Sequence, residues 1–116
     1  MRESDGEVLV LTTVADSEQA RALAQSLLDL HLAACVTCIA GGLSFFRWKS
    51  ATVSQEQELV LLLKTHRAKL AEIERHFQTA HPYEVPELVV LPIAALSDAY
   101  GEWMRDELNL SPKGDA

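Results

Sequence analysis

The stretch HPYEVPE, residues 81–87, brings a histidine, a tyrosine and two glutamates together between two prolines. An imidazole beside carboxylates suits a divalent-metal site, because both groups are common metal ligands. The same residue types serve acid–base catalysis, which needs two carboxylates that converge on a substrate and differ in pKa. Pro82 and Pro86 restrict the backbone, so the stretch is also predicted to be a stiff connector between a helix and a strand.

His81 is the main candidate for a metal ligand in this stretch. Because it precedes Pro82 at the end of a predicted helix, its ring could instead satisfy the last carbonyl groups and interact with the helix dipole. Tyr83 could cover a cleft, although we favour half-buried packing for an aromatic ring with a polar tip. A hydrolase that uses His81, Tyr83 and Glu84 is the least favoured hypothesis, since proline does not make the carboxylates converge.

Two other groups of residues have both a chemical and a structural interpretation. Lys64 ends a predicted buried strand, and we expect it to form an ion pair with Glu84 or Glu58. Trp48 and the pair Phe45–Phe46 could stack on a ligand. Aromatic residues are also enriched in subunit interfaces, and this second interpretation is the one we favour.

The two cysteines, Cys35 and Cys38, have the C-x-x-C spacing of a thiol redox pair or of half a zinc site. Their neighbours predict a strand, in which residues three apart point to opposite faces. No second pair of ligands with similar spacing completes a zinc site. We therefore expect two buried structural cysteines.

The elements that must position these side chains follow from the spacing of the apolar residues. Strands are predicted over 8–13, 33–49, 58–65 and 87–93, and helices over 17–31, 66–80 and 97–108. The first strand is expected to be buried on both faces, and Asp16 with Gln19 resembles a capping box. Gly41–Gly42 predicts a bulge. Along one side of the third helix we expect Leu96, Tyr100, Trp103 and Glu107.

The order β-α-β-β-α-β-α predicts an α+β protein of the ferredoxin-like, or split βαβ, class. Its antiparallel sheet would carry the helices on one face. The hairpin over about 34–64 is long for so small a sheet, so it should protrude and expose apolar edges. Because exposed edges need covering, we expect the hairpin to pair with other copies of the chain.

Length and charge limit the partners of this protein. The 116 residues predict a single domain, with a core over about 7–108 and a disordered tail at 109–116. The net charge of −7 argues against binding to nucleic acid or to an anionic membrane surface. No apolar run approaches the roughly 18–20 residues of a membrane span. We expect a cytoplasmic protein.

Three motifs, in this order, resemble those of one known family, the CutA divalent-cation tolerance proteins. They are AACVTCIAGGLSFFRWK at 33–49, QELVLLLKT at 57–65 and HPYEVPELVVLPI at 81–93, and Tyr100 and Trp103 follow them. The resemblance extends from about residue 7 to residue 108. It implies ferredoxin-like subunits that form a trimer similar to the PII signalling proteins, with pairing between subunits through the long hairpin.

The resemblance also implies a role without catalysis. Bacterial members are associated with tolerance to copper and other divalent metals, and a mammalian relative is linked to the anchoring of acetylcholinesterase. Metal ligands described in bacterial members correspond to Thr12, Ala80 and His81, so that His81 alone keeps a ligand side chain. Since a soft or borderline metal ion needs three or four nitrogen or sulfur ligands, copper contact should be weak or indirect, with Glu84, Cys35 or His81 of other subunits assisting.

We therefore expect a non-enzymatic homotrimer that acts in the response to divalent metals. No cofactor is expected to be obligatory, and copper or another divalent cation could bind. A cleft between subunits is expected to contain Cys35, Trp48, Lys64, Tyr83 and Glu84. One alternative is a PII-like sensor that binds a small anionic metabolite through Lys64, Arg47 and Lys49. Another alternative is a trimer that anchors or binds other proteins.

Overall fold

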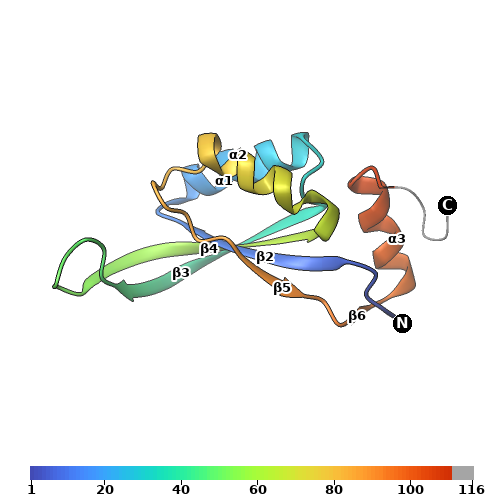
Figure 1. Cartoon of the computed structure of the whole chain (residues 1–116), viewed down its shortest axis with the longest axis horizontal. Helices are drawn as coiled ribbons and strands as arrows, with labels where there is room; N and C mark the ends of the chain where they lie inside the picture. The colour runs from blue at the N-terminus through green and yellow to red at the C-terminus, as the bar shows by residue number, and fades with distance from the viewer. Residues whose placement is uncertain (111–116) are drawn as a thin grey trace.

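A four-stranded antiparallel sheet is the centre of the computed structural model, which describes residues 1–110. Its strand order is β3-β4-β2-β5, with bounds Cys35–Phe46, Ser54–His66, Glu7–Val14 and Val89–Pro92. Helices α1 (Ser17–Asp29) and α2 (Leu70–Ala80) cover one face of this sheet (Figure 1). The predicted ferredoxin-like α+β class is confirmed. Residues 111–116, most of the predicted disordered tail, lie outside the described residues.

Local sequence signals explain where the two covering helices begin. The carboxylate of Asp16 accepts a hydrogen bond from the Gln19 amide at 2.8 Å, and the Gln19 side chain accepts one from the Ala15 amide at 2.9 Å. The predicted helix start at Asp16 is confirmed, with Gln19 bonded to the amide one residue before the N-cap. The helix predicted over 66–80 begins instead with a 3-10 turn, Arg67–Lys69, because the His66 side chain accepts a hydrogen bond from the Ala68 amide.

The main core lies between the helices and the sheet. Strand β2 alternates between side chains that are fully buried under the helices and side chains that are only half-buried on the other face. The prediction that this strand is buried on both faces is therefore wrong for the single chain. The buried aliphatic and aromatic residues of this core include Val8, Val10, Val14, Leu23, Leu27, Leu61, Leu63, Ile73 and Phe77.

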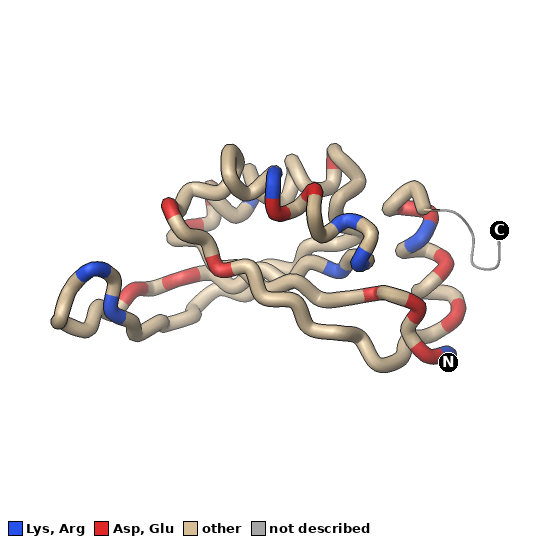
Figure 2. The backbone as a smooth tube through the Cα atoms, in the orientation of Figure 1, with Lys and Arg blue, Asp and Glu red and all other residues tan. Residues whose placement is uncertain are grey.

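Strands β3 and β4 form a hairpin that extends beyond the helical layer (Figure 1). The register shifts between Ile39 and Gly42, so the predicted bulge is confirmed. A side chain at Gly42 would meet the Glu58 carbonyl oxygen at 2.7 Å, which explains the need for glycine. Figure 2 shows basic positions at the tip of the hairpin and acidic positions on the strand that leaves it.

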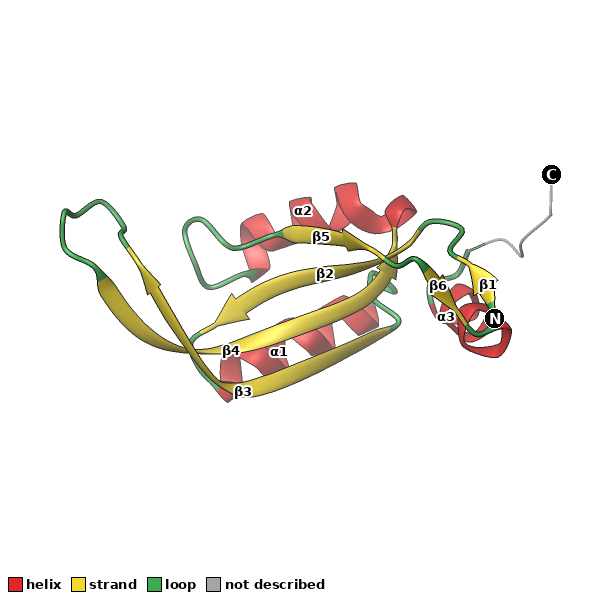
Figure 3. Ribbon diagram, turned by 90° about the horizontal axis from the view of Figure 1, so that it is seen from below, coloured by secondary structure: helices red, strands yellow, loops and turns green. Residues whose placement is uncertain are grey.

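The sheet face opposite α1 and α2, which we call the open face, carries no helix (Figure 3). Because side chains alternate along a strand and paired residues share a face, the register of β2, β4 and β5 defines which residues lie on the open face. Its half-buried or exposed aliphatic residues are Leu9, Leu11, Val60, Leu62, Val89 and Leu91. A single chain thus leaves a contiguous apolar surface uncovered.

A second, smaller unit lies at one end of the sheet. Strands β1 (Arg2–Glu3) and β6 (Ala95–Leu96) pair there, and helix α3 (Asp98–Glu107) follows with Ser97 as its N-cap, as predicted. Tyr100 and Trp103 are exposed, whereas Gly101, Met104 and Leu108 are buried.

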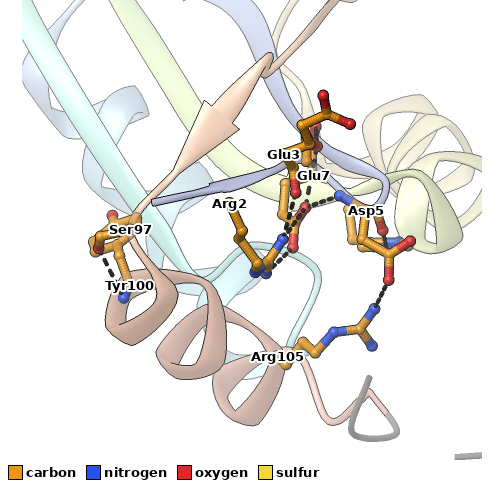
Figure 4. Close-up of polar contacts among 9 residues, drawn as sticks. Arg2, Glu3, Asp5, Glu7, Ser97, Tyr100 and Arg105 are labelled. Carbon is orange, nitrogen blue, oxygen red and sulfur yellow. Dashed lines mark hydrogen bonds and ion pairs between the residues drawn. The ribbon is translucent and has the colours of Figure 1, made fainter. Parts of the chain in front are cut away.

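A buried ion pair joins β1 to the start of β2 (Figure 4). The Arg2 guanidinium lies 2.8 Å from the Glu7 carboxylate, whose side chain is only 1% exposed. Ser4 Oγ and the Asp5 amide also donate to Glu7, at 3.1 and 2.6 Å. A methyl group at Gly101 would meet the guanidinium end of the Arg2 side chain, so Arg2 would have to shift to make room for it.

Candidate functional site

His81 ends helix α2 and is buried against β2, with 7% of its surface exposed. Its Nδ1 accepts a hydrogen bond from the Tyr83 amide at 3.1 Å, and its Nε2 lies 2.9 Å from Thr12 Oγ1. Because Nδ1 is an acceptor, the neutral ring must carry its proton on Nε2, which therefore donates to Thr12. Both ring nitrogens are thus engaged.

The electrostatic environment of His81 keeps the ring neutral. Burial lowers the pKa of His81 below 6.5, and the Thr13 backbone and the Glu58 carboxylate oppose this only in part. The suggested role of a cation that satisfies the last carbonyl groups of the helix is wrong, since the ring bonds to Thr12 and Tyr83 instead. His81 fastens the connector 81–87 to the sheet.

This environment predicts a dependence of stability on pH. Since the pKa of His81 is lower in the folded chain than 6.5, its contribution to stability is complete above that pH and is lost as the pH falls through the folded pKa. We expect the melting temperature of the wild type to fall between pH 7 and 5 more steeply than that of His81→Gln. Differential scanning fluorimetry measures these melting temperatures. If the melting temperatures of the wild type and of His81→Gln fall equally between pH 7 and 5, this expectation is contradicted.

Tyr83 and Glu58 form the second polar contact of the connector. The Tyr83 hydroxyl donates to Glu58 Oε2 at 2.7 Å, and Glu58 is buried. Burial would raise the pKa of Glu58, but hydrogen bonds from Tyr83, Ser44 and Thr13 lower it below 4.5. Burial and Glu58 raise the pKa of Tyr83. Glu58 is thus an ionised acceptor at neutral pH, and Tyr83 stays protonated as its donor.

Tyr83→Phe should therefore destabilise the protein. The substitution keeps the ring and leaves the buried Glu58 carboxylate with one donor fewer, which costs about 1.5–3 kcal/mol for a hydrogen bond to a charged group. Urea unfolding at pH 7 measures the change. Tyr100→Phe is the matched control, because Tyr100 is exposed on α3, and it should change stability by less than about 0.5 kcal/mol.

An open groove of about 580 Å³ lies between the hairpin and the connector. It contains three of the five residues predicted to share a cleft, Trp48, Tyr83 and Glu84. Cys35 and Lys64 do not line it, since they pair with each other across β3 and β4. The remaining lining residues are Thr13, Ala15, Phe46, Glu56, Gln57, Glu58, Pro82, Val85 and Glu87.

Lys64 has different partners from those predicted. Its ammonium lies 2.9 Å from Thr37 Oγ1 and 3.6 Å from Cys35 Sγ, so the expected ion pair with Glu84 or Glu58 is wrong. Glu84 instead pairs with Lys49 at 3.4 Å. The register explains the error, because Lys64 pairs with Cys35 and Leu9, several residues along β4 from Glu58.

The two cysteines are unbridged and diverge as predicted. Cys35 pairs with Lys64 and Cys38 with Leu61, which lie on opposite faces of β4. Their predicted burial is wrong for the single chain, where Cys35 is half-buried and Cys38 is exposed. Both cysteines are more exposed than predicted because β3 is an edge strand of the sheet and has a neighbouring strand on one side only.

A tight copper site does not fit the residues of the described chain. Within residues 1–110, no group of three or more His, Cys, Asp or Glu side chains could hold a metal ion. Thr12 occupies one side of the His81 ring and the Tyr83 amide occupies the other. A metal ion would have to displace one of these bonds without gaining further nitrogen or sulfur ligands.

Sequence reasoning did not detect the two contacts that hold the connector. Thr12 and His81 are 69 positions apart, and Glu58 and Tyr83 are 25 apart. Only the strand register brings these pairs together. A partial signal was present for Thr12, which is a polar residue within an apolar strand sequence and therefore needs a buried partner.

Comparison with known proteins identifies the family. The family model described as CutA1 divalent ion tolerance protein matches residues 8–107. The chain belongs to the CutA family. The divalent-cation tolerance protein CutA of Thermus thermophilus is 41% identical over 86% of this chain and 96% of its own length. The chloroplastic protein CutA of Arabidopsis thaliana is 36% identical, over 85% of this chain and 54% of that protein.

Solved CutA structures share the fold. The Cut A1 structure from Thermus thermophilus has a TM-score of 0.82 at 40% identity and covers 87% of this chain and 97% of its own. The CutA structure from Synechococcus elongatus has a TM-score of 0.86 at 36% identity and covers 91% and 93%. An Archaeoglobus fulgidus relative is described as periplasmic. In residues 1–110 of this chain, no helix is long and apolar enough to cross a membrane.

Proposed function

We propose that this protein is a non-enzymatic homotrimer that acts in the cellular response to divalent metal ions, copper among them. Membership of the CutA family supports the metal response. The open face is the observation that supports assembly, because a sheet face of half-buried and exposed aliphatic side chains with no helix over it needs a cover. The cytoplasm is the proposed compartment.

The metal response would be indirect in this proposal. His81 has no free lone pair while it bonds to Thr12 and Tyr83, so it would hold the connector instead of a copper ion. No cofactor is required for this role. The anionic-metabolite alternative loses support from the groove, whose lining contains four glutamates, Glu56, Glu58, Glu84 and Glu87, and no lysine or arginine.

Calorimetric titration with copper(II) at pH 7 tests the indirect role. We expect no saturable site of one ion per subunit in the micromolar range, and the same weak isotherm for the wild type and for His81→Gln. The control is His31→Gln, because His31 is an exposed histidine whose ring contacts the Glu107 carbonyl at the end of α3, away from the connector. A stoichiometric site that disappears in His81→Gln and persists in His31→Gln would overturn the proposal.

A further inference from the structure

We propose that His31 is a latch that holds helix α3 and the N-terminal strap, residues 1–5, against the rest of the chain. In this proposal, α3 and the strap open and close as one unit. The proposal is independent of the metal response. It starts from an unusual backbone position, because His31 has a φ of 55°, in the left-handed region where glycine is the usual residue.

The turn after α1 explains the conformation of His31. The His31 amide donates to the Leu28 carbonyl at 3.0 Å, and the Leu32 amide donates to the Leu27 carbonyl at 2.9 Å. This pair of bonds is the Schellman motif, which requires a left-handed residue at the position of His31. Glycine would adopt this conformation without the crowding of a Cβ atom. A strained backbone position that keeps a large side chain points to a role for that side chain.

The imidazole of His31 reaches the end of α3. Its Nδ1 lies 2.9 Å from the backbone oxygen of Glu107, the last residue of α3. Because a carbonyl oxygen can only accept, Nδ1 carries the proton and donates it to this bond. The last carbonyl groups of a helix have no partners within the helix, so His31 supplies one from outside. The latch thus joins the ends of α1 and α3, although the two residues are 76 positions apart.

Helix α3 packs in a small cluster that is separate from the main core. The buried residues of this cluster are Ala34, Leu96, Met104 and Leu108. A segment that buries few apolar side chains opens at a lower free energy than the main core does. Opening of α3 would uncover this cluster at the end of the sheet, while the main core and the open face stay folded.

The strap is fastened to β6 and α3, so it should move with them. Strand β1 pairs with β6, and the Ser4 amide donates to the Ala94 carbonyl at 3.0 Å. Arg105 of α3 donates to the Asp5 carboxylate at 3.0 Å (Figure 4). The strap enters β2 through Gly6, which has a φ of 98°. Because glycine has the greatest backbone freedom, this position suits a hinge.

Two other contacts hold the unit at the strap. His66 Nδ1 accepts from the Ala68 amide, so its Nε2 carries the proton and donates to the Asp5 carbonyl at 2.8 Å. Arg2 forms the buried ion pair with Glu7 of β2. The latch lies at the far end of α3 from these contacts. If α3 and the strap are one unit, loss of the latch should therefore loosen the strap as well.

The test is hydrogen exchange measured by mass spectrometry on the assembled protein at pH 7, for the wild type and His31→Gly. The variant removes the imidazole and places glycine at the left-handed position. We expect exchange about 3-fold faster or more in both α3 and the strap. Exchange in the last turn of α1 should become about 2-fold slower, because the strain is relieved. General destabilisation would instead speed exchange in all three segments.

Asn109→Gly is the matched control. Asn109 follows α3 and has the same left-handed backbone, with a φ of 54°, so glycine relieves strain there without removing the latch. Exchange in α3 should not become faster in this variant. Light scattering should give the molar mass of the wild type for both variants.

Four results would overturn the inference. They are unchanged exchange of α3 in His31→Gly, faster exchange of α3 without faster exchange of the strap, loss of assembly in His31→Gly, and an equal effect of Asn109→Gly on α3. Copper binding has its own measurement and does not enter this test.

Discussion

Arg2→Ala is expected to lower the free energy of unfolding by about 3 kcal/mol, because it leaves the buried Glu7 carboxylate without its counter-charge. Burial alone would raise the pKa of Glu7, but the hydrogen bonds from Arg2, the Asp5 amide and Ser4 lower it to about 2. A drop in pKa from 4.5 to about 2 corresponds to a stabilisation of the same order, about 3 kcal/mol. Because the Asp5 amide and Ser4 contribute to this lowering as well as Arg2, about 3 kcal/mol is the upper limit of the part that Arg2→Ala removes through the pKa.

The pH dependence of this effect has a defined sign. Since Glu7 has a lower pKa in the folded chain, its stabilisation is complete above pH 4.5 and is lost as the pH falls through about 2. Chemical denaturation from pH 7 to 3 should show a difference between wild type and Arg2→Ala that is constant down to about pH 5 and smaller below it. Arg67→Ala, an exposed arginine, is the control. A cost for Arg2→Ala no larger than for Arg67→Ala would contradict the account.

Leu91→Lys is expected to convert the assembled protein into monomers. Leu91 lies on the open face of the edge strand β5 and is 44% exposed in the single chain, so a lysine there is tolerated by the subunit. In the proposed trimer, the ammonium group would be buried against apolar side chains of neighbouring subunits, at a cost of several kcal/mol for each interface. Light scattering coupled to size-exclusion chromatography measures the loss of assembly.

The matched control is Leu30→Lys. Leu30 follows helix α1 and is 54% exposed, but it lies on the helical side of the sheet. This variant should retain the mass of the wild type. If Leu30→Lys and Leu91→Lys have the same molar mass in solution, the open face is not the assembly surface.

The sequence could predict the elements whose signals are local. The apolar run in 8–13, the Asp16 cap and the glycine pair at 41–42 each depend on a few neighbouring residues, and the strand, helix start and bulge that they predict agree with the structure except at element ends. Helix α3 shows where local reasoning fails. The spacing puts Tyr100 and Trp103 on one side of this helix, but it does not show which side packs, and in the structure the packed side carries Gly101 and Met104.

The candidate site was predictable only in part, because its contacts join distant strands. The connector 81–87 was found from its composition, and Trp48, Tyr83 and Glu84 do line one groove. Lys64 and Cys35 were assigned to the same place although the register puts them elsewhere on the sheet. The partner of His81 is Thr12, whose residue type had indicated only a lost metal ligand. The hydroxyl at that position gives the imidazole a structural partner.

The molar mass of the native protein, measured by light scattering in a chelator and then with added copper(II), shows whether the subunits assemble without a metal ion. We expect a trimer of about 38 kDa, three times the chain mass of 12.8 kDa, under both conditions and across a dilution series. Such a result fits subunits that assemble through the open face without a metal ion. A monomer in the chelator that becomes a larger species only with copper would contradict the claim.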